Sequence, residues 1–218
     1  MSQPPETSDD PFHGRRPTSH ERMSGRPWDA SYEDGPAPWD MGGPQPAVVR
    51  LASRGAFEGP VLDAGCGTGE NALHLASLGL EVVGVDVAGT ALEIARAKAA
   101  DRGIDVELLT ADAFALQDLG RRFGTVLDCG LFHTCDEEER PRYAASVASV
   151  TEQGGTLFVL CFSDAGPGSG PHPVSQDSLR ATFGRRSDWE VATIARERIH
   201  TRFDDAGASA WLATITRV

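Results

Sequence analysis

Three glycines at alternating positions mark the part of the sequence best suited to bind a ligand. They are Gly65, Gly67 and Gly69, and they follow a short apolar segment that contains Asp63. Glycines in a turn let the backbone approach a ligand closely, because no Cβ atom is in the way. The dinucleotide-binding pattern G-x-G-x-x-G would need a third glycine at position 70, where the chain has Glu70. The spacing therefore argues against a dinucleotide.

The acidic residue before the turn narrows the choice of ligand. A carboxylate at Asp63 would repel a pyrophosphate but would suit a cationic ammonium group. The pattern D-x-G-x-G-x-G therefore favours S-adenosyl-L-methionine, whose amino-acid end carries such a group. Cofactor contacts are predicted for the turn and the first residues after it: Asp63, Gly65, Cys66, Gly67, Gly69 and Asn71.

Two more acidic residues follow the next two predicted strands. Asp86 can accept hydrogen bonds from both hydroxyls of a ribose. Asp112 can accept from the exocyclic amine of adenine, and Ala113 can supply a backbone N–H. Val87 is also predicted to contact the cofactor. The alternative for Asp86 and Asp112 is a purely structural role as the N-cap of the helix that follows.

The segment after the fourth predicted strand should face the reacting end of the ligand, since ligands of open α/β sheets bind at the carboxyl ends of the strands. Asp128 and Gly130 are predicted to contact the cofactor there. His133 is the predicted general base, because the pKa of an imidazole lies near working pH. The alternative is a histidine with a structural role. His172 is a second candidate for the base.

Helical and strand patterns alternate along most of the chain. Strands are predicted at 60–64, 81–86, 105–110, 125–130 and 155–162, and helices at 46–55, 70–78, 90–101, 114–119, 137–150 and 175–183. This alternation predicts a parallel sheet with helices on both faces. Two further strands, at 189–200 and 208–218, are joined by a short loop, which predicts an antiparallel hairpin.

The first 44 residues have a different composition. Residues 1–27 are rich in Pro, Ser, Asp, Arg and Gly, and we expect them to be a disordered tail. Residues 28–44 contain the aromatic residues Trp28, Tyr32 and Trp39 among glycines and prolines. One interpretation is that these rings fasten the tail to the domain surface. The other is that Trp39 and Asp40 form one wall of a ligand site.

In combination, these motifs resemble the class I S-adenosylmethionine-dependent methyltransferases over about residues 45–218. The resemblance implies a doubly wound, Rossmann-like, mostly parallel seven-stranded sheet. The segment 38–46, PWDMGGPQP, is similar to the N-terminal signature of the thiopurine S-methyltransferase-like branch, which includes halide and thiol methyltransferases. That similarity implies that residues 28–44 cover the bound cofactor, with Trp39 near its methionine part.

Further short segments resemble small actinobacterial enzymes that methylate heterocyclic toxins such as hydroxyquinolones, some relatives of which act on dithiols. These segments are residues 132–133, 136–140 and 160–164. The resemblance implies methyl transfer to a small aromatic or heterocyclic acceptor, on a hydroxyl or ring nitrogen, by in-line displacement. Methylation of a thiol or dithiol is the alternative. Residues predicted to bind the acceptor are Trp28, Phe132, Phe162 and His172.

Two other functions stay open at this point. A nucleotide-binding oxidoreductase would use a similar fold, although Glu70 and Asp63 argue against it. A sensor that binds the cofactor without catalysis would keep the same glycines. A methyl-transfer assay separates the sensor from the enzyme.

Composition sets limits on partners and location. The chain has 218 residues and a formal net charge of −12, which argues against binding to nucleic acid or to an anionic membrane. It contains no apolar run long enough for a membrane span and no signal peptide, so we expect a cytoplasmic protein. Its four cysteines lack the spacing of a disulfide framework or a zinc site, so no metal is predicted. The small size favours a monomer.

Overall fold

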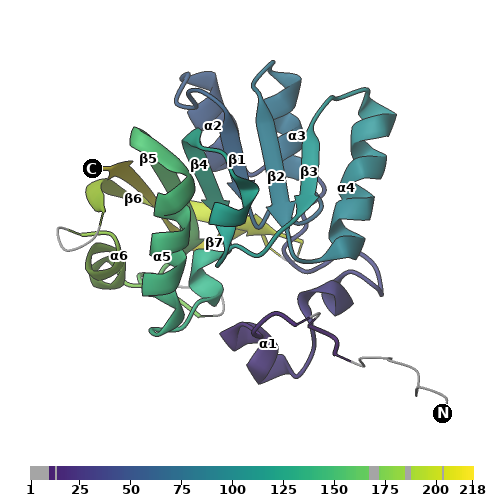
Figure 1. The fold of residues 1–218 in the computed structure, drawn as a ribbon, viewed down its shortest axis with the longest axis horizontal. Helices are drawn as coiled ribbons and strands as arrows, with labels where there is room; N and C mark the ends of the chain where they lie inside the picture. The colour runs from purple at the N-terminus through teal and green to yellow at the C-terminus, as the bar shows by residue number, and fades with distance from the viewer. Residues whose placement is uncertain (1–9, 13, 167–171, 185–187, 203) are drawn as a thin grey trace, which may run out of the picture.

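The protein is described by a computed structural model that covers residues 10–12, 14–166, 172–184, 188–202 and 204–218. Figure 1 shows one sheet with helices on both of its faces. The strands are β1 (Val61–Ala64), β2 (Val82–Asp86), β3 (Glu107–Thr110), β4 (Phe123–Cys129), β5 (Thr151–Phe162), β6 (Trp189–Thr201) and β7 (Asp204–Arg217). The α-helices are α1 (Ser19–Ser24), α2 (Pro46–Ser53), α3 (Glu70–Ser77), α4 (Gly89–Arg102), α5 (Glu139–Val150) and α6 (Gln176–Thr182). Short 3-10 helices are η1 (Trp28–Ser31), η2 (Leu116–Leu119) and η3 (Phe132–Thr134).

The sheet has the strand order β3-β2-β1-β4-β5-β7-β6. Strands β1 to β5 pair in parallel, and β7 runs antiparallel between β5 and β6. The predicted doubly wound, mostly parallel seven-stranded sheet with a C-terminal antiparallel hairpin is therefore confirmed. One detail differs, because β7 begins at Asp204 and takes in most of the expected loop at 204–207.

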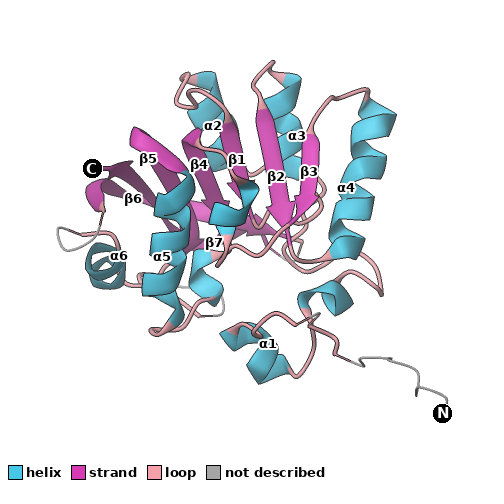
Figure 2. Cartoon of the chain, in the orientation of Figure 1, coloured by secondary structure: helices cyan, strands magenta, loops and turns pink. Residues whose placement is uncertain are grey.

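Helices cover the sheet in two layers (Figure 2). Helices α2 and α3 pack behind it, around Val48, Leu75 and Phe158, while α5 and α6 pack in front, around Tyr143 and Leu179. All four residues of β1 are buried, as expected for a central strand that is covered on both faces. The carboxyl ends of β1, β2 and β4 therefore meet in the middle of one sheet edge.

The N-terminal segment is ordered where the structure describes it, so the prediction of a disordered tail over residues 1–27 is wrong for α1. Thr18 and Glu21 form a capping box at the start of this helix, and Gly25 ends it in a left-handed conformation. The Glu21 carboxylate is buried and binds the Arg15 guanidinium at 2.5 and 2.8 Å. Polar contacts therefore order this segment, which has too few large apolar residues to form a core of its own. Residues 1–9 and 13 lie outside the described residues.

Helix α1 lies next to the carboxyl edge of the sheet, below it in Figure 1. The Ser19 hydroxyl donates to the backbone oxygen of Thr134 over 2.6 Å. The Arg22 guanidinium reaches Asp136 at 2.6 Å and Glu139 at 3.0 Å. These contacts hold α1 against the segment that follows β4.

A second attachment joins the N-terminal segment to α4. The N-cap position of α4 is Ala88, whose side chain cannot accept a hydrogen bond. Asp29, from η1, takes over that role: its carboxylate accepts from the Thr90 backbone N–H at 2.8 Å and from the Thr90 hydroxyl at 3.0 Å. A residue distant in sequence thus caps this helix.

None of the helices in the described part of the chain has the length and apolar content needed to cross a membrane.

Replacing Asp29 with Ala should destabilise the fold by about 1 kcal/mol, because the backbone N–H and the hydroxyl of Thr90 lose their acceptor. The free energy of unfolding can be measured by urea titration with far-UV circular dichroism. Asp34, an exposed residue of the same segment, provides the control, and Asp34→Ala should unfold like the wild type. Equal stability of Asp29→Ala and Asp34→Ala would contradict the capping role.

Candidate active site

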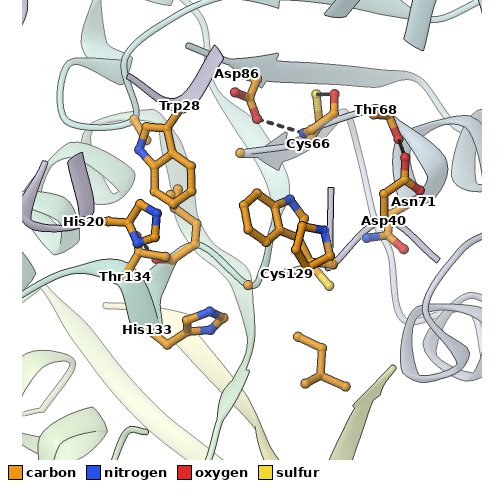
Figure 3. A pocket seen from close by; sticks show the side chains of 18 of the residues that line it. His20, Trp28, Asp40, Cys66, Thr68, Asn71, Asp86, Cys129, His133 and Thr134 are labelled. Atoms are coloured by element: carbon orange, nitrogen blue, oxygen red, sulfur yellow. Dashed lines mark hydrogen bonds between the residues drawn. The ribbon is translucent and has the colours of Figure 1, made fainter. Parts of the chain in front are cut away.

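A cavity of about 390 Å³ lies at the carboxyl edge of the sheet, between the strand ends and the N-terminal segment. Figure 3 shows its two sides: Asp40, Thr68 and Asn71 lie on one, and His20, Trp28 and His133 lie on the other. Many of the predicted site residues line it: Trp28, Trp39, Gly65, Cys66, Gly67, Asn71, Asp86, Val87, Asp112, Ala113, Gly130, His133, Phe162 and His172.

The glycine turn after β1 has the backbone geometry that its sequence predicts. Gly65 and Gly67 have φ values of 73° and 53°, in the left-handed region that favours glycine. A Cβ atom on Gly65 would lie 3.1 Å from the Leu131 side chain, and one on Gly67 would lie 3.1 Å from the Tyr32 hydroxyl. Larger residues would therefore fill the space between the turn and the walls that face it.

Gly69 has a different role from the other two glycines. It does not line the cavity, and a Cβ atom there would meet the Cβ of Ala95 at 2.9 Å. Its position allows α3 and α4 to pack closely. The predicted cofactor contact at Gly69 is therefore replaced by helix packing.

Asp86 lies at the end of β2 with its carboxylate at the cavity wall. It accepts from the backbone N–H of Gly67 at 2.8 Å and of Ala88 at 2.9 Å, which fixes its orientation. Burial raises the pKa of this carboxyl group, and the backbone hydrogen bonds oppose that rise. Each carboxylate oxygen has a second lone pair, so Asp86 can also accept from two neighbouring ligand hydroxyls.

Asp112 and Ala113 follow β3 and line the same end of the cavity. One Asp112 oxygen accepts from the backbone N–H of Phe114 at 2.9 Å. The short helix η2 begins at Leu116 and has Ala115 as its N-cap, so Asp112 is not its cap. The aspartate is thus held in an Asx turn beside the cavity.

Aromatic rings from the N-terminal segment form the outer wall. His20 stacks on Trp28 with ring centroids 4.3 Å apart, and Trp28 meets Trp39 edge to face at 5.9 Å. The Trp39 indole N–H donates to the Tyr32 hydroxyl at 3.1 Å. The predicted ligand wall in residues 28–44 therefore extends into α1.

His133 lies in η3, on the same side of the cavity as His20 and Trp28 (Figure 3), and is 8% exposed. Its ring centroid is 4.5 Å from that of Phe162. Its Nδ1 is buried and has no hydrogen-bond partner among the described residues. Burial is the largest cause that lowers the pKa of His133 to about 3, and the neighbouring His172 and His20 contribute to the same shift. The imidazole is therefore neutral at physiological pH.

Two predicted site residues after β4 are structural. The Asp128 carboxylate accepts from the backbone N–H groups of Leu131 and Phe132 and from the Tyr143 hydroxyl, the last at 2.6 Å. It holds the turn after β4 and does not line the cavity. Phe132 is fully buried between Tyr143 and Phe183. The cavity lining therefore gives no support to the predicted cofactor contact at Asp128 or the predicted acceptor contact at Phe132.

Asp63 is a third predicted residue that does not line the cavity. It is 1% exposed, and neither of its carboxylate oxygens has a hydrogen-bond partner among the described residues. Gly65 and Cys66 donate their backbone N–H groups to Val85, so the turn closes over the aspartate. Burial raises the pKa of Asp63 to about 7.

Several lining residues were not predicted from the sequence. They include Arg15, Thr18, His20, Tyr32, Gln45, Thr68 and His200, whereas the predicted Asp40 lines the cavity as expected. The T-x-x-E signature at Thr18 was the available signal for an ordered helix. No local pattern predicts a place in the cavity wall for Gln45. Its side chain forms a pair of hydrogen bonds with the backbone of His200, 155 residues further on.

Within the described ranges, no group of three His, Cys, Asp or Glu side chains is placed to hold a metal ion.

The free energy of unfolding should fall as pH rises through the range set by Asp63. An unfolded Asp loses its proton near pH 4, whereas the folded Asp63 keeps its proton up to about pH 7. The folded state therefore binds more protons between these values, and stability falls with rising pH. Asp63→Asn removes this loss, on the order of a few kcal/mol. Urea titrations of the ligand-free protein at pH 5 and pH 8 test it, and equal pH dependence of wild type and variant would contradict it.

Replacing Asp86 with Ala should weaken binding of S-adenosylhomocysteine by about 1.5–3 kcal/mol, the typical contribution of a hydrogen bond to a charged group. Isothermal calorimetry measures the affinity, and circular dichroism checks that the variant is folded. Asp118→Ala is the matched control, since Asp118 is exposed and absent from the cavity wall. If the affinity of Asp86→Ala equals that of the control, the ribose assignment is wrong.

Comparisons with known proteins agree with this geometry. A family model described as "Methyltransferase domain" matches residues 61–155. A 2-heptyl-1-hydroxyquinolin-4(1H)-one methyltransferase of Mycobacteroides abscessus is 39% identical over 178 residues, 78% of each chain. A probable thiol methyltransferase 2 of Arabidopsis thaliana is 32% identical over 152 residues, which cover 68% of this chain and 67% of the relative.

Solved structures show the same fold. One, from work on the conversion of a disulfide bond into a thioacetal group during echinomycin biosynthesis, has a TM-score of 0.74 and 36% identity, with 83% of this chain and 84% of that chain covered. The magnesium protoporphyrin IX methyltransferase of Synechocystis PCC 6803, solved with bound S-adenosylmethionine, has a TM-score of 0.61 and 22% identity, with 79% and 76% covered.

The glycine turn, the strand order and these relatives agree on the donor, which is S-adenosylmethionine. The chain belongs to the S-adenosylmethionine-dependent methyltransferases.

Proposed function

We propose that this methyltransferase acts on a hydroxyl or ring nitrogen of a small, flat, aromatic or heterocyclic molecule. The observation that carries the proposal is the ring-lined half of the cavity. Side chains of His20, Trp28, His133 and Phe162 surround it. Flat aromatic faces bind a flat acceptor through stacking and apolar burial, which suits a heteroaromatic ring better than a flexible chain.

The other half of the cavity fits the donor. Asp86 would bind the ribose hydroxyls, and Asp112 with Ala113 would bind the adenine. The glycine turn, with Trp39 and Asn71, would hold the methionine part. The left-handed conformations of Gly65 and Gly67 leave room for such a ligand beside the backbone. When bound, S-adenosylmethionine supplies a methyl group that a nucleophile can displace from a positively charged sulfur.

The contribution of the protein to such a reaction is mainly to hold the acceptor in line with the methyl group and to exclude water. The N-terminal segment would exclude water, because its aromatic wall covers the cavity on the side that faces the strand ends. His133 was predicted as a general base, and this remains a prediction. His172 lines the cavity too, and residues 167–171 before it lie outside the described residues.

Methylation of a thiol or dithiol is the second candidate function. The relative from Arabidopsis thaliana is named a probable thiol methyltransferase, and the structure from the echinomycin work concerns a disulfide. The name of the Mycobacteroides abscessus relative, which is more similar in sequence, supports a hydroxyquinolone-like acceptor. The expectations of a monomer, a cytoplasmic location and no nucleic-acid partner stay predictions.

A methyl-transfer assay with labelled S-adenosylmethionine tests the proposal. The acceptor panel should contain hydroxyquinolones, phenols, aliphatic thiols and dithiols of similar size. We expect turnover of the heteroaromatic hydroxyl compounds with a kcat/KM at least tenfold above that of the thiols. Turnover of thiols alone would assign the protein to the second candidate. Failure of the whole panel, with S-adenosylhomocysteine still bound, would favour a binding protein without this activity.

A further inference from the structure

The surroundings of His133 lack the groups that normally equip a histidine to remove a proton. A general-base histidine is usually oriented by a carboxylate or carbonyl that binds its second nitrogen and stabilises the imidazolium. Here the buried Nδ1 has no partner among the described residues. The ring instead packs against Phe162, and its Cε1 lies 3.6 Å from the position of a Cβ atom on Gly130.

The ionisable groups around His133 also disfavour a positive charge on it. The nearest in electrostatic effect are His20 from α1 and His172 from the segment after β5, and both lower its pKa. A second cavity, of about 420 Å³, shares His133, Thr134 and His172 with the first. The charged side chains that line this second cavity are Asp136, Glu137 and Arg140 near the start of α5, and Asp164 after β5.

None of these carboxylates forms an ion pair with His133. Asp136 pairs with Arg22 at 2.6 Å. Asp128, which lies beneath the turn, is occupied by two backbone N–H groups and the Tyr143 hydroxyl. A proton placed on the buried imidazole would therefore have no carboxylate paired with it among the described residues.

A bound donor changes the electrostatics of the cavity for an acceptor that carries a negative charge. S-adenosylmethionine brings its positive sulfur into the same cavity. Among the described residues, the carboxylates that line this cavity are Asp40, Asp86 and Asp112, together with Glu70 of α3. Asp86 is bound by backbone N–H groups, and Asp40 accepts from the Thr68 hydroxyl at 2.7 Å. The Arg15 guanidinium, which also lines the cavity, is paired with the Glu21 carboxylate. An acceptor anion would meet the sulfonium on one side and the neutral His133 imidazole on the other.

We propose that the acceptor enters the cavity already ionised, as an oxyanion or thiolate, and that His133 positions it through a hydrogen bond from its imidazole N–H instead of removing its proton. This inference rests on the proposed methyl transfer. In the transfer step, the acceptor oxygen or sulfur forms a bond to the methyl carbon. The bond from that carbon to the sulfonium sulfur breaks, and its electron pair stays on sulfur. No proton moves in this step, because the acceptor has lost its proton to water beforehand.

The proposal restricts the class of acceptor. Compounds whose hydroxyl or thiol ionises near neutral pH, such as N-hydroxy heteroaromatics and phenols with electron-withdrawing groups, should be good acceptors. Weakly acidic alcohols of the same shape should be poor ones. Acidity of the acceptor then becomes a determinant of specificity alongside its shape.

The pH dependence of kcat/KM for phenols with different numbers of ring fluorines tests the proposal, since fluorine changes acidity with little change in shape. We expect kcat/KM to rise tenfold per pH unit and to level off at the pKa of each acceptor, so that the midpoint moves with the acceptor. His133→Asn should keep these midpoints while raising KM. His74→Asn is the control, because His74 lies on α3 away from the cavity, and it should match the wild type.

A neutral acceptor that gives its proton to His133 would produce the opposite profile. The value of kcat/KM would then fall above the pKa of each acceptor, and this result would overturn the proposal. So would a midpoint that is the same for every acceptor and disappears in His133→Asn. If no fluorophenol or hydroxyquinolone reacts at all, the proposed methyl transfer itself fails, and the inference fails with it.

Binding can be measured without turnover. Calorimetry of an acceptor with the enzyme bound to S-adenosylhomocysteine, below the pKa of the acceptor and in two buffers of different ionisation enthalpy, counts the protons released. One proton released per acceptor is the expected result for the wild type. Binding without proton release would mean that the acceptor keeps its proton or gives it to the protein, and would overturn the proposal.

Discussion

The meeting of strand ends at the middle of the sheet is the constraint on which the site depends. The chain runs from β1 outward to β3 and then returns to β4 on the other side of β1. The loops after β1 and β4 therefore diverge to opposite faces of the sheet and leave a crevice at its carboxyl edge. Gly65 lies on one side of this crevice and Leu131 on the other, and a Cβ atom on Gly65 would lie 3.1 Å from the Leu131 side chain. The position of the cavity thus follows from the order of the strands.

A crevice in a sheet edge is open to water, and the N-terminal segment supplies the missing wall. Its attachment is mostly polar: Asp29 caps α4, and Arg22 pairs with acidic residues at the start of α5. Surface ion pairs of this kind each contribute little to stability. Several of them acting with the His20–Trp28 stack can still fix the segment's position, which is what a cavity wall requires. Such an arrangement holds the wall in place without the large apolar contacts of the main core.

The sequence predicts the main domain well because its elements are long and their periodicity is regular. The predicted boundaries of β2, α4 and β5 fall within a few residues of the observed ones. Helix α1 was missed because composition measures apolar content, whereas this helix is held by a capping box and by partners more than 100 residues away. Tertiary partners of that kind leave no local pattern.

The site residues show the same division. Asp86 is the last residue of β2 and Asp128 is the last but one of β4, and the sequence predicts a cofactor contact for both. Only the first lines the cavity, because the second turns toward Tyr143 and the backbone after β4. The direction of a side chain at a strand end depends on how the following loop folds, and this is decided by contacts across the sheet. The glycine turn was predictable because its requirement is local: left-handed backbone angles that favour glycine.

The charges of the cavity have a consequence for the reaction. Carboxylates line the part of the cavity where the donor would lie, and the neutral His133 imidazole lies where we place the acceptor. If the acceptor enters ionised, as we propose, a positive and a negative reactant become two neutral products. Opposite charges attract more strongly in a cavity shielded from water, and their loss during transfer needs little rearrangement of the protein. A buried histidine that stays neutral would serve such a reaction better than a charged one, because a fixed positive charge would hold the anion in its unreacted state.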